Sequence, residues 1–230
     1  MSQVVEALRG LLRAYPIPST LGPLFEWTVP PIKSLNEVLR EYENNLTRFS
    51  FDVLNEQLGK VDFRRAHKEL IRQLAARAFG EGWQEGGGDL SDIGSKELDS
   101  IQDWIDGQVE HVNDFAAWLV STDADGKINT EAKRRELDDR IDLWVASLRG
   151  LGQLGEAKAQ GDPIIYLDGD DGVESCEECQ EFKGRENAHR LSWWEKRGLL
   201  TRNGNANYGC GRWENCHHSF YNRVGELVIA

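Results

Sequence analysis

The sequence predicts a mainly α-helical protein, in which a bundle of long amphipathic helices precedes a small C-terminal α+β domain. Apolar residues recur at helical spacing in long segments between residues 34 and 151, and short polar breaks separate these segments. Beyond about residue 160 the pattern changes, because short β-type runs and many glycines and asparagines replace the helical periodicity. All 4 cysteines of the chain lie in this last part.

Residues 1–33 are predicted to form a short amphipathic helix and a proline-rich arm. The helix covers residues 1–14, where charged side chains interrupt the apolar ones in a way that is not typical of a signal peptide. Proline cannot donate a backbone hydrogen bond, so the segment 15–33 should be extended. Such an arm either wraps over its own chain or tethers it to a neighbour. We expect it to bind a partner through Pro16, Pro18, Pro23, Pro30 and Pro31.

Residues 34–160 are the predicted helical domain. Ser34 is expected to cap its first helix, and Ser95 and Thr130 are expected to begin its third and fourth helices. Glycine-rich and polar segments, GEGWQEGGG and STDADGKIN, should break the helical pattern between them. The expected helices are 34–59, 61–80, 95–120 and 130–151.

Two features of the helical domain could bind ligands but are interpreted as structural. The segment STDADGKINTEA is similar to a calcium-binding loop, yet Ala132 stands where the bidentate glutamate of such a loop belongs. We therefore expect a simple turn. His67 and His111 lie within predicted helices and are expected to be ordinary surface or boundary residues.

The chain is strongly acidic, with a formal net charge of −12. The acidic excess lies upstream, because the segment from Glu174 to the end carries eight basic and eight acidic residues. A negative surface disfavours nucleic-acid binding through bulk electrostatics. It indicates either a well-solvated surface or a face that docks onto a basic partner. No apolar run reaches the ~20 residues that a membrane span needs, so no membrane partner is expected.

Residues 161–230 are the predicted C-terminal domain. The runs 163–167 and 226–229 are β-type, and we expect them to pair with each other and close the domain. Between them the segment LSWWEKRGLL, residues 191–200, indicates one helical segment or a turn. A domain of this size is expected to be too small to bury a core of its own.

The cysteines form two pairs, of which the first is spaced C-x2-C and the second C-x5-C. A Zn²⁺ ion takes four thiolate or imidazole ligands at tetrahedral corners, and a C-x2-C turn supplies two of them from one bend. In small zinc domains the metal contributes folding free energy on the order of 10 kcal/mol. The pattern therefore predicts a structural zinc ion bound by Cys176, Cys179, Cys210 and Cys216.

Alternatives to this ligand set remain open. The C-x5-C spacing is wider than a usual zinc knuckle, so His217 or His218 can replace one cysteine of the second pair. The four thiols can also be reduced and packed as small apolar side chains. A redox C-x-x-C pair is disfavoured, because surrounding carboxylates oppose thiolate formation. These carboxylates are Glu174, Glu177, Glu178 and Glu181.

A zinc enzyme is the second class of function considered for the tail. His217, His218 and Asn222, in the motif HHSFYN, could serve a zinc-dependent nuclease or a related DNA-processing enzyme. A catalytic zinc keeps one coordination position open for water, whereas four cysteines close the site. A DNA-cleaving enzyme also usually displays a basic groove, and the neutral tail contains few arginines. We therefore expect no enzymatic activity.

Three motifs follow one another through about the last 70 residues: Cys176, Cys179 and Gly184 as C-x-x-C-x-x-x-x-G, a tryptophan segment over 193–199, and Cys210, Gly211 and Trp213 as a CGxW-type turn. This order resembles the phage head morphogenesis proteins, the minor head proteins similar to the phage Mu F protein. The helix expected before and around Gln108 to Phe115 also looks like the long helix of that family. The chain departs from the family at its end, where a closing C-x-C is replaced by Cys216-His217-His218.

The resemblance implies a structural minor head (capsid) protein of a tailed bacteriophage, which acts in head morphogenesis at or near the portal. It implies a virion component that is assembled in the cytoplasm of the bacterial host. Its partners would be the portal protein, the major capsid protein or both, with packaged DNA as a further contact. The departure at the chain's end makes His218 a substitute zinc ligand. The competing hypothesis is the zinc-dependent nuclease that uses His217 and His218.

Overall fold

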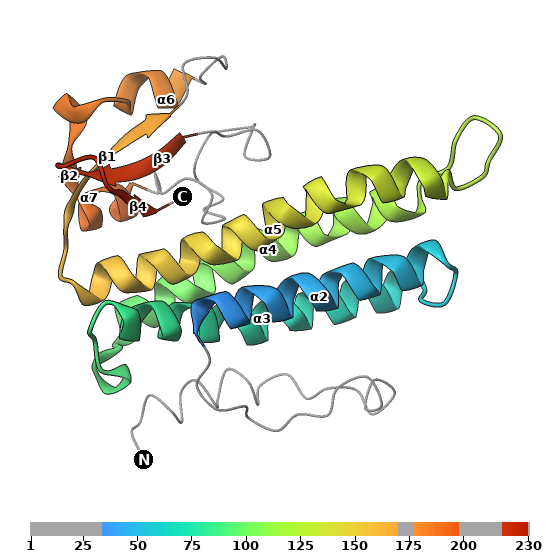
Figure 1. Ribbon diagram of the computed structural model, residues 1–230, viewed down its shortest axis with the longest axis horizontal. Helices are drawn as coiled ribbons and strands as arrows, with labels where there is room; N and C mark the ends of the chain where they lie inside the picture. The colour runs from blue at the N-terminus through green and yellow to red at the C-terminus, as the bar shows by residue number, and fades with distance from the viewer. Residues whose placement is uncertain (1–33, 170–176, 198–217, 230) are drawn as a thin grey trace.

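The computed structural model describes residues 34–169, 177–197 and 218–229 (Figure 1). The expected N-terminal helix and the proline-rich arm, residues 1–33, lie outside this range. The described chain is mainly helical and carries one small antiparallel sheet. The predicted fold class is confirmed to that extent.

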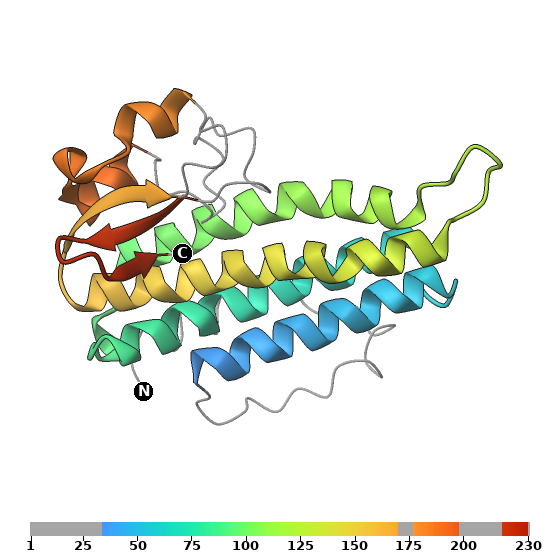
Figure 2. The same cartoon turned by 45° about the horizontal axis from the view of Figure 1, so that its top comes forward.

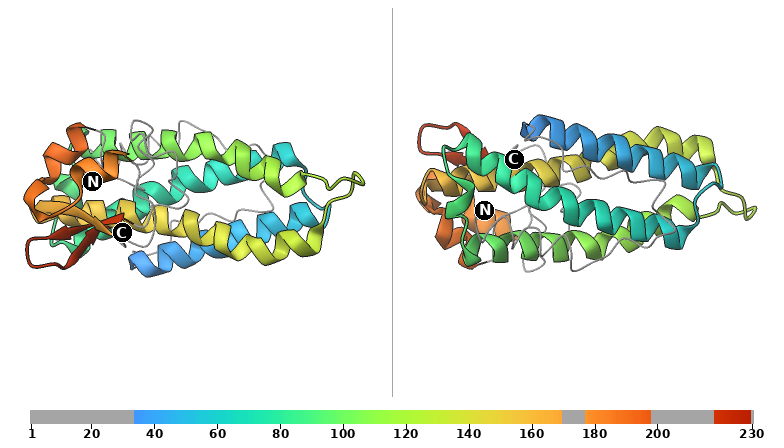
Figure 3. Two further views of the ribbon diagram at one scale, coloured as in Figure 1. Left: turned by 90° about the horizontal axis from the view of Figure 1, so that it is seen from above. Right: turned by 90° about the horizontal axis from the view of Figure 1, so that it is seen from below.

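Long helices form an elongated bundle, as the pattern of apolar residues predicts (Figures 1 and 2). Viewed from above and below, α3 and α5 lie between α2 and α4 at the end of the bundle that carries the sheet, and the helices cross toward the other end (Figure 3). Aromatic and aliphatic side chains from all of them form one continuous core. The helices are α2 (Leu35–Leu54), α3 (Lys60–Glu85), α4 (Ser95–Val120) and α5 (Thr130–Ala159).

The starts of these helices agree with the predicted ones because polar groups satisfy their first backbone N–H groups. Ser34 precedes α2, and its backbone N–H donates to the Glu37 carboxylate at 3.1 Å, as in a capping box. The side-chain oxygen of Asn129 accepts a hydrogen bond from the Ala132 N–H at 3.0 Å at the start of α5. The predicted break between α4 and α5 is confirmed as a turn, in which Asp123 accepts hydrogen bonds from the N–H groups of Asp125 and Lys127.

Two helices run further than their sequences predict, because glycines allow α3 and α5 to approach closely. α3 continues through the glycine-rich segment to Glu85, and α5 continues to Ala159. A Cβ atom added to Gly82 would overlap the backbone carbonyl of Gly152, and one added to Gly155 would overlap the carbonyl of Phe79. Glycine weakens an isolated helix, but here the tertiary contact that it permits outweighs its low helix propensity.

The sheet has four antiparallel strands in the order β2-β1-β3-β4. The expectation that the two terminal runs pair with each other was wrong, because β3 lies between β1 and β4. β3 and β4 form a local hairpin, in which the Asn222 side-chain oxygen accepts from the N–H groups of Val224 and Glu226. A hairpin closes a much shorter loop than a pairing of the two ends would. The strands are β1 (Ile164–Gly169), β2 (His189–Arg190), β3 (His218–Asn222) and β4 (Leu227–Ile229).

Short helical segments connect the strands. The helix expected within residues 191–200 is present as α7 (Leu191–Lys196), and α6 (Glu177–Phe182) follows β1. Single 3-10 turns, η2 (Leu90–Asp92) and η3 (Arg185–Asn187), occupy the link between α3 and α4 and the segment before β2.

The sheet shares the apolar core of the bundle. Trp194 of α7 is fully buried, donates its indole N–H to the Ile165 carbonyl at 3.2 Å and packs edge-on against Phe220. These residues belong to the same hydrophobic cluster as the core of the helices. The Lys158 ammonium of α5 lies 2.6 Å from the Glu195 carboxylate of α7, which ties the two parts together. The domain boundary near residue 161 stays a prediction.

No helix in the described parts of the chain combines the length and the apolar character that a membrane crossing requires.

The close approach of α3 and α5 predicts opposite effects for two substitutions in one helix. Gly82→Ala should lower the free energy of unfolding by about 2–3 kcal/mol, because the new methyl group overlaps the Gly152 carbonyl. Gly80→Ala is the matched control, since a Cβ there would lie 3.4 Å from a Leu90 side-chain carbon, an ordinary contact. It should leave stability unchanged or raise it by up to about 1 kcal/mol. Urea unfolding followed by circular dichroism checks both, and equal effects of the two would contradict the packing argument.

Candidate functional site

The two cysteine-bearing stretches are attached to the same end of the sheet. β1 and β3 pair antiparallel, and their register places Gly169, the last residue of β1, opposite His218, the first residue of β3. The chain leaves β1 at Gly169 toward Cys176 and Cys179, and it enters β3 directly after Cys210 and Cys216. Residues paired across an antiparallel ladder are about 5 Å apart. The topology thus brings together the two positions from which the chain leads into the predicted cysteine ligands.

The segment after the first cysteine pair returns to β1. The backbone N–H of Gly184 donates to the Leu167 carbonyl at 2.9 Å, and Lys183 and Leu167 form an isolated bridge. This contact brings the C-terminal end of α6 beside β1, two residues from Gly169 in the strand. Gly184 has a φ of 106°, a conformation that glycine adopts easily, which explains a glycine at this position of the motif.

Only part of the predicted ligand set falls within the described backbone. Cys179 lies in α6 and His218 begins β3. Cys176, Cys210, Cys216 and His217 lie outside the described residues. Within the described parts, no three side chains of the metal-ligating types are placed to share an ion. The ligand set, including the choice between cysteine and histidine, stays a prediction.

The chemistry of the donor groups fits zinc. Thiolate and imidazole are the ligands that a structural Zn²⁺ ion prefers. One cysteine pair follows β1 and the other precedes β3, so each pair could supply two ligands to one ion. The sheet gives this end a fixed frame, because Leu167 and Phe220 face each other across β1 and β3 and are fully buried. A bound ion would therefore join two segments whose starting points are already held together.

His67 is not the surface or boundary residue that the sequence suggests, because it lies fully buried at the centre of the bundle. Its Nε2 atom and the Tyr42 hydroxyl oxygen are 3.0 Å apart and share a hydrogen bond. Aromatic rings surround it, and the nearest, that of Trp144, has its centroid 4.6 Å from the imidazole centroid. Its Nδ1 atom has no hydrogen-bond partner in the part of the chain that is described.

Burial keeps His67 uncharged and excludes it as an accessible catalytic base. Desolvation lowers the pKa of His67 to about 3 and raises the pKa of Tyr42 well above its ordinary value. The Tyr42 hydroxyl therefore keeps its proton and can donate it to Nε2. Tyr42 and His67 have no solvent access, and their hydrogen bond fixes the packing of α2 against α3.

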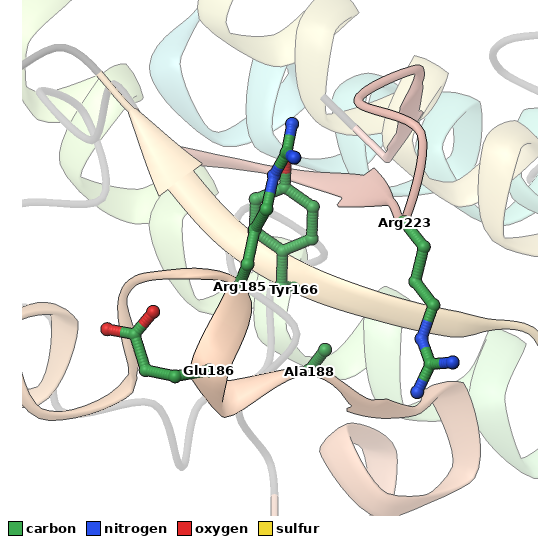
Figure 4. A pocket seen from close by; sticks show the side chains of 5 residues that line it. All are labelled: Tyr166, Arg185, Glu186, Ala188 and Arg223. Carbon is green, nitrogen blue, oxygen red and sulfur yellow. The ribbon is translucent and has the colours of Figure 1, made fainter.

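A pocket on the sheet was not predicted from the sequence. It has a volume of about 360 Å³ and is lined by side chains from β1, the segment before β2 and the β3–β4 turn (Figure 4). Its lining residues are Tyr166, Arg185, Glu186, Ala188 and Arg223. They are far apart in sequence and form no motif, so only the fold brings them together.

Comparison of the chain with protein-family models, with curated proteins and with solved structures found no match. The resemblance to phage head morphogenesis proteins therefore depends on the motifs and their placement, and it stays a prediction.

The buried imidazole predicts a pH dependence of stability. In the unfolded chain His67 titrates near its ordinary pKa of 6.5, whereas in the fold its pKa is about 3. Between these values the unfolded state binds more protons, so stability falls as the pH drops from 6.5 toward 3. The contribution of this residue is at most about 1.4 kcal/mol per pH unit. Urea unfolding between pH 7 and pH 4 should therefore show a shallower slope for His67→Gln than for the unaltered protein.

Tyr42→Phe is the control for this measurement. It removes the hydroxyl that contacts Nε2 but leaves a buried imidazole, so the pH slope should persist while overall stability decreases. Equal slopes for His67→Gln and the unaltered protein would show that His67 does not titrate with unfolding.

Proposed function

We propose that the chain is a structural minor head protein of a tailed bacteriophage, which acts in head morphogenesis at or near the portal. The observation that carries the proposal is the register of β1 against β3. It attaches the C-x2-C stretch and the CGxW stretch, the motifs on which the family resemblance depends, to one end of one sheet. Both stretches therefore join the sheet at neighbouring positions, Gly169 and His218, which a metal site shared between them would require.

The architecture supports an assembly role. A long helical bundle supplies extended side surfaces, and a small sheet at one end supplies a second surface (Figure 1). The proline-rich arm, residues 15–33, would reach a neighbouring subunit, because extended chain spans more distance per residue than a helix. The proposed partners are the portal protein, the major capsid protein or both, with packaged DNA as a further contact. The proposed location is the virion.

We assign the zinc ion a structural role. Cys176, Cys179, Cys210 and Cys216, or three of them with His217 or His218, would close the coordination sphere and leave no position for water. The ion would stabilise the two cysteine-bearing stretches against each other at the Gly169–His218 end. The second hypothesis, a zinc-dependent nuclease that uses His217 and His218, depends on side chains outside the described set and stays a prediction.

Zinc should be present at about one ion per chain in purified protein, measured by elemental analysis. Cys179→Ser should lower the zinc content and the hydrogen-exchange protection of α6, whereas the bundle helices keep theirs. The reason is that the bundle helices contribute most of the buried apolar core. His111→Gln, outside the motif, is the control and should bind zinc as the unaltered protein does. Unchanged protection of α6 after complete removal of the metal would contradict a structural zinc ion here.

The assembly role predicts where the protein is found. In particles of the phage that encodes it, mass spectrometry should detect the chain in purified heads, at far fewer copies than the major capsid protein. Heads assembled without tails should still contain it, and isolated tails should lack it. Its absence from purified heads would refute the proposed function while leaving the zinc site untouched.

A further inference from the structure

One side of α4 carries an acidic stripe, in which exposed carboxylates recur every three or four residues along the helix. Its members are Asp99, Asp103, Asp106, Glu110 and Asp114. None of them forms an ion pair within the described ranges, and α4 contains no lysine or arginine after Lys96. Like charges at this spacing destabilise a helix, so a positive partner would stabilise this face.

A basic stripe runs along the neighbouring helix, α3. Arg64 and Lys68 are one turn apart on the same side, and neither forms an ion pair in the parts of the chain that the structure describes. Lys68 precedes Arg77 by about two and a half turns, so the two side chains leave opposite sides of α3. Arg77 binds Glu41 of α2 at 3.0 Å. The basic stripe therefore lies on the side of α3 that faces away from α2.

The two stripes lie at matching heights along the bundle. α3 and α4 are neighbouring antiparallel helices (Figure 3). The centroid of the Phe115 ring of α4 lies 5.8 Å from that of Phe63 and 5.9 Å from that of His67, both of α3. Because the two helices rise equally per residue, Lys68 lies at a height between those of Glu110 and Asp114. The charges therefore match in height.

Two-fold symmetry would convert this match into pairing between two copies. If the symmetry axis runs parallel to the helices, α3 of each copy faces α4 of the other and heights are preserved. Lys68 of one copy would then lie between Glu110 and Asp114 of the other, with Arg64 near Asp114. Each of these contacts would occur twice. Val61, one turn before Arg64 and 57% exposed, adds an apolar side chain to the basic stripe.

We propose that the surface formed by α3 and α4 binds a second copy of this chain in a symmetric dimer. A partner of one sign, such as a nucleic acid or a basic peptide, would be attracted by one stripe and repelled by the other. A second copy presents both signs at the required heights. The inference goes beyond the proposed role in the phage head and does not depend on it.

The test is sedimentation of the full-length protein over a range of concentrations. We expect a reversible monomer–dimer equilibrium at about 50 mM salt that shifts toward monomer at about 500 mM, because salt screens exposed charges. Reversing one stripe should weaken the dimer at least about tenfold, since every charge contact occurs twice. The acidic stripe is reversed by Glu110→Lys with Asp114→Lys, and the basic stripe by Arg64→Glu with Lys68→Glu.

Mixing the two reversed variants is the decisive measurement. One variant then has two basic stripes and the other has two acidic stripes, so each repels its own kind and attracts the other. The mixture should form a mixed dimer although neither variant dimerises alone. A single chain that carries all the reversals regains complementary stripes and should dimerise by itself.

A matched control separates this surface from an effect of net charge. Arg40→Glu with Arg149→Glu changes the net charge by the same amount as the reversal of the basic stripe, but at exposed positions of α2 and α5. This variant should dimerise as the unaltered protein does. Circular dichroism checks that each variant folds, and recovery of dimers in the mixture would itself show that the reversed chains are folded.

Any of three other results would overturn the proposal. A protein that stays monomeric at low salt and high concentration does not use this surface for self-association. Dimers that persist after reversal of either stripe are formed through another surface. Equal loss of dimers in the Arg40 and Arg149 control would assign the effect to net charge rather than to the two stripes.

Discussion

The pairing of β1 with β3 is the constraint on which the arrangement of the C-terminal part depends. Its register is fixed because Leu167 and Phe220 must both face the core, and a slip of one residue would turn these side chains to the opposite face of the sheet. The same register puts Tyr166 opposite Tyr221 on the other face and Gly169 opposite His218 at the end. One set of backbone hydrogen bonds therefore positions Tyr166 in the pocket on the sheet and the two points, Gly169 and His218, at which the cysteine-bearing stretches join it.

The sequence predicted the helices well at their starts and poorly at their ends. Starts are marked locally, by Ser34 and by the polar residues before α5, whose side chains or backbone satisfy the first turn. Ends were placed too early in α3 and α5 because glycine is a poor helix former. These glycines are favourable only because α3 and α5 pack closely where Gly82 meets Gly152. A contact between two helices cannot be read from the local sequence of either one. β3 was missed for a similar reason, since its pairing with β1 spans residues 165–222.

The candidate site, like the helices, could be predicted from the sequence only where its signals are local. The cysteine spacing is a local pattern and could be recognised, whereas the pocket on the sheet combines three separate segments and could not. His67 is an instructive error. It is four residues after Phe63 and three before Leu70, so it occupies the apolar stripe of α3, and this spacing was the available signal. Its polarity favoured a surface position, but Tyr42 supplies the hydrogen bond that makes burial of a neutral imidazole tolerable.

Because the sheet shares the apolar core of the bundle, it does not depend on a metal ion for an interior. The sequence suggested that residues 161–230 lack an interior and need zinc to fold at all. Instead Trp194, Phe220 and Ile229 pack into the same cluster as the helices, and the Lys158–Glu195 ion pair adds a polar tie. The strands thus gain stability from the bundle without a metal ion. The proposed zinc ion would then be needed to hold only the cysteine-bearing stretches, and not the sheet to which they are joined.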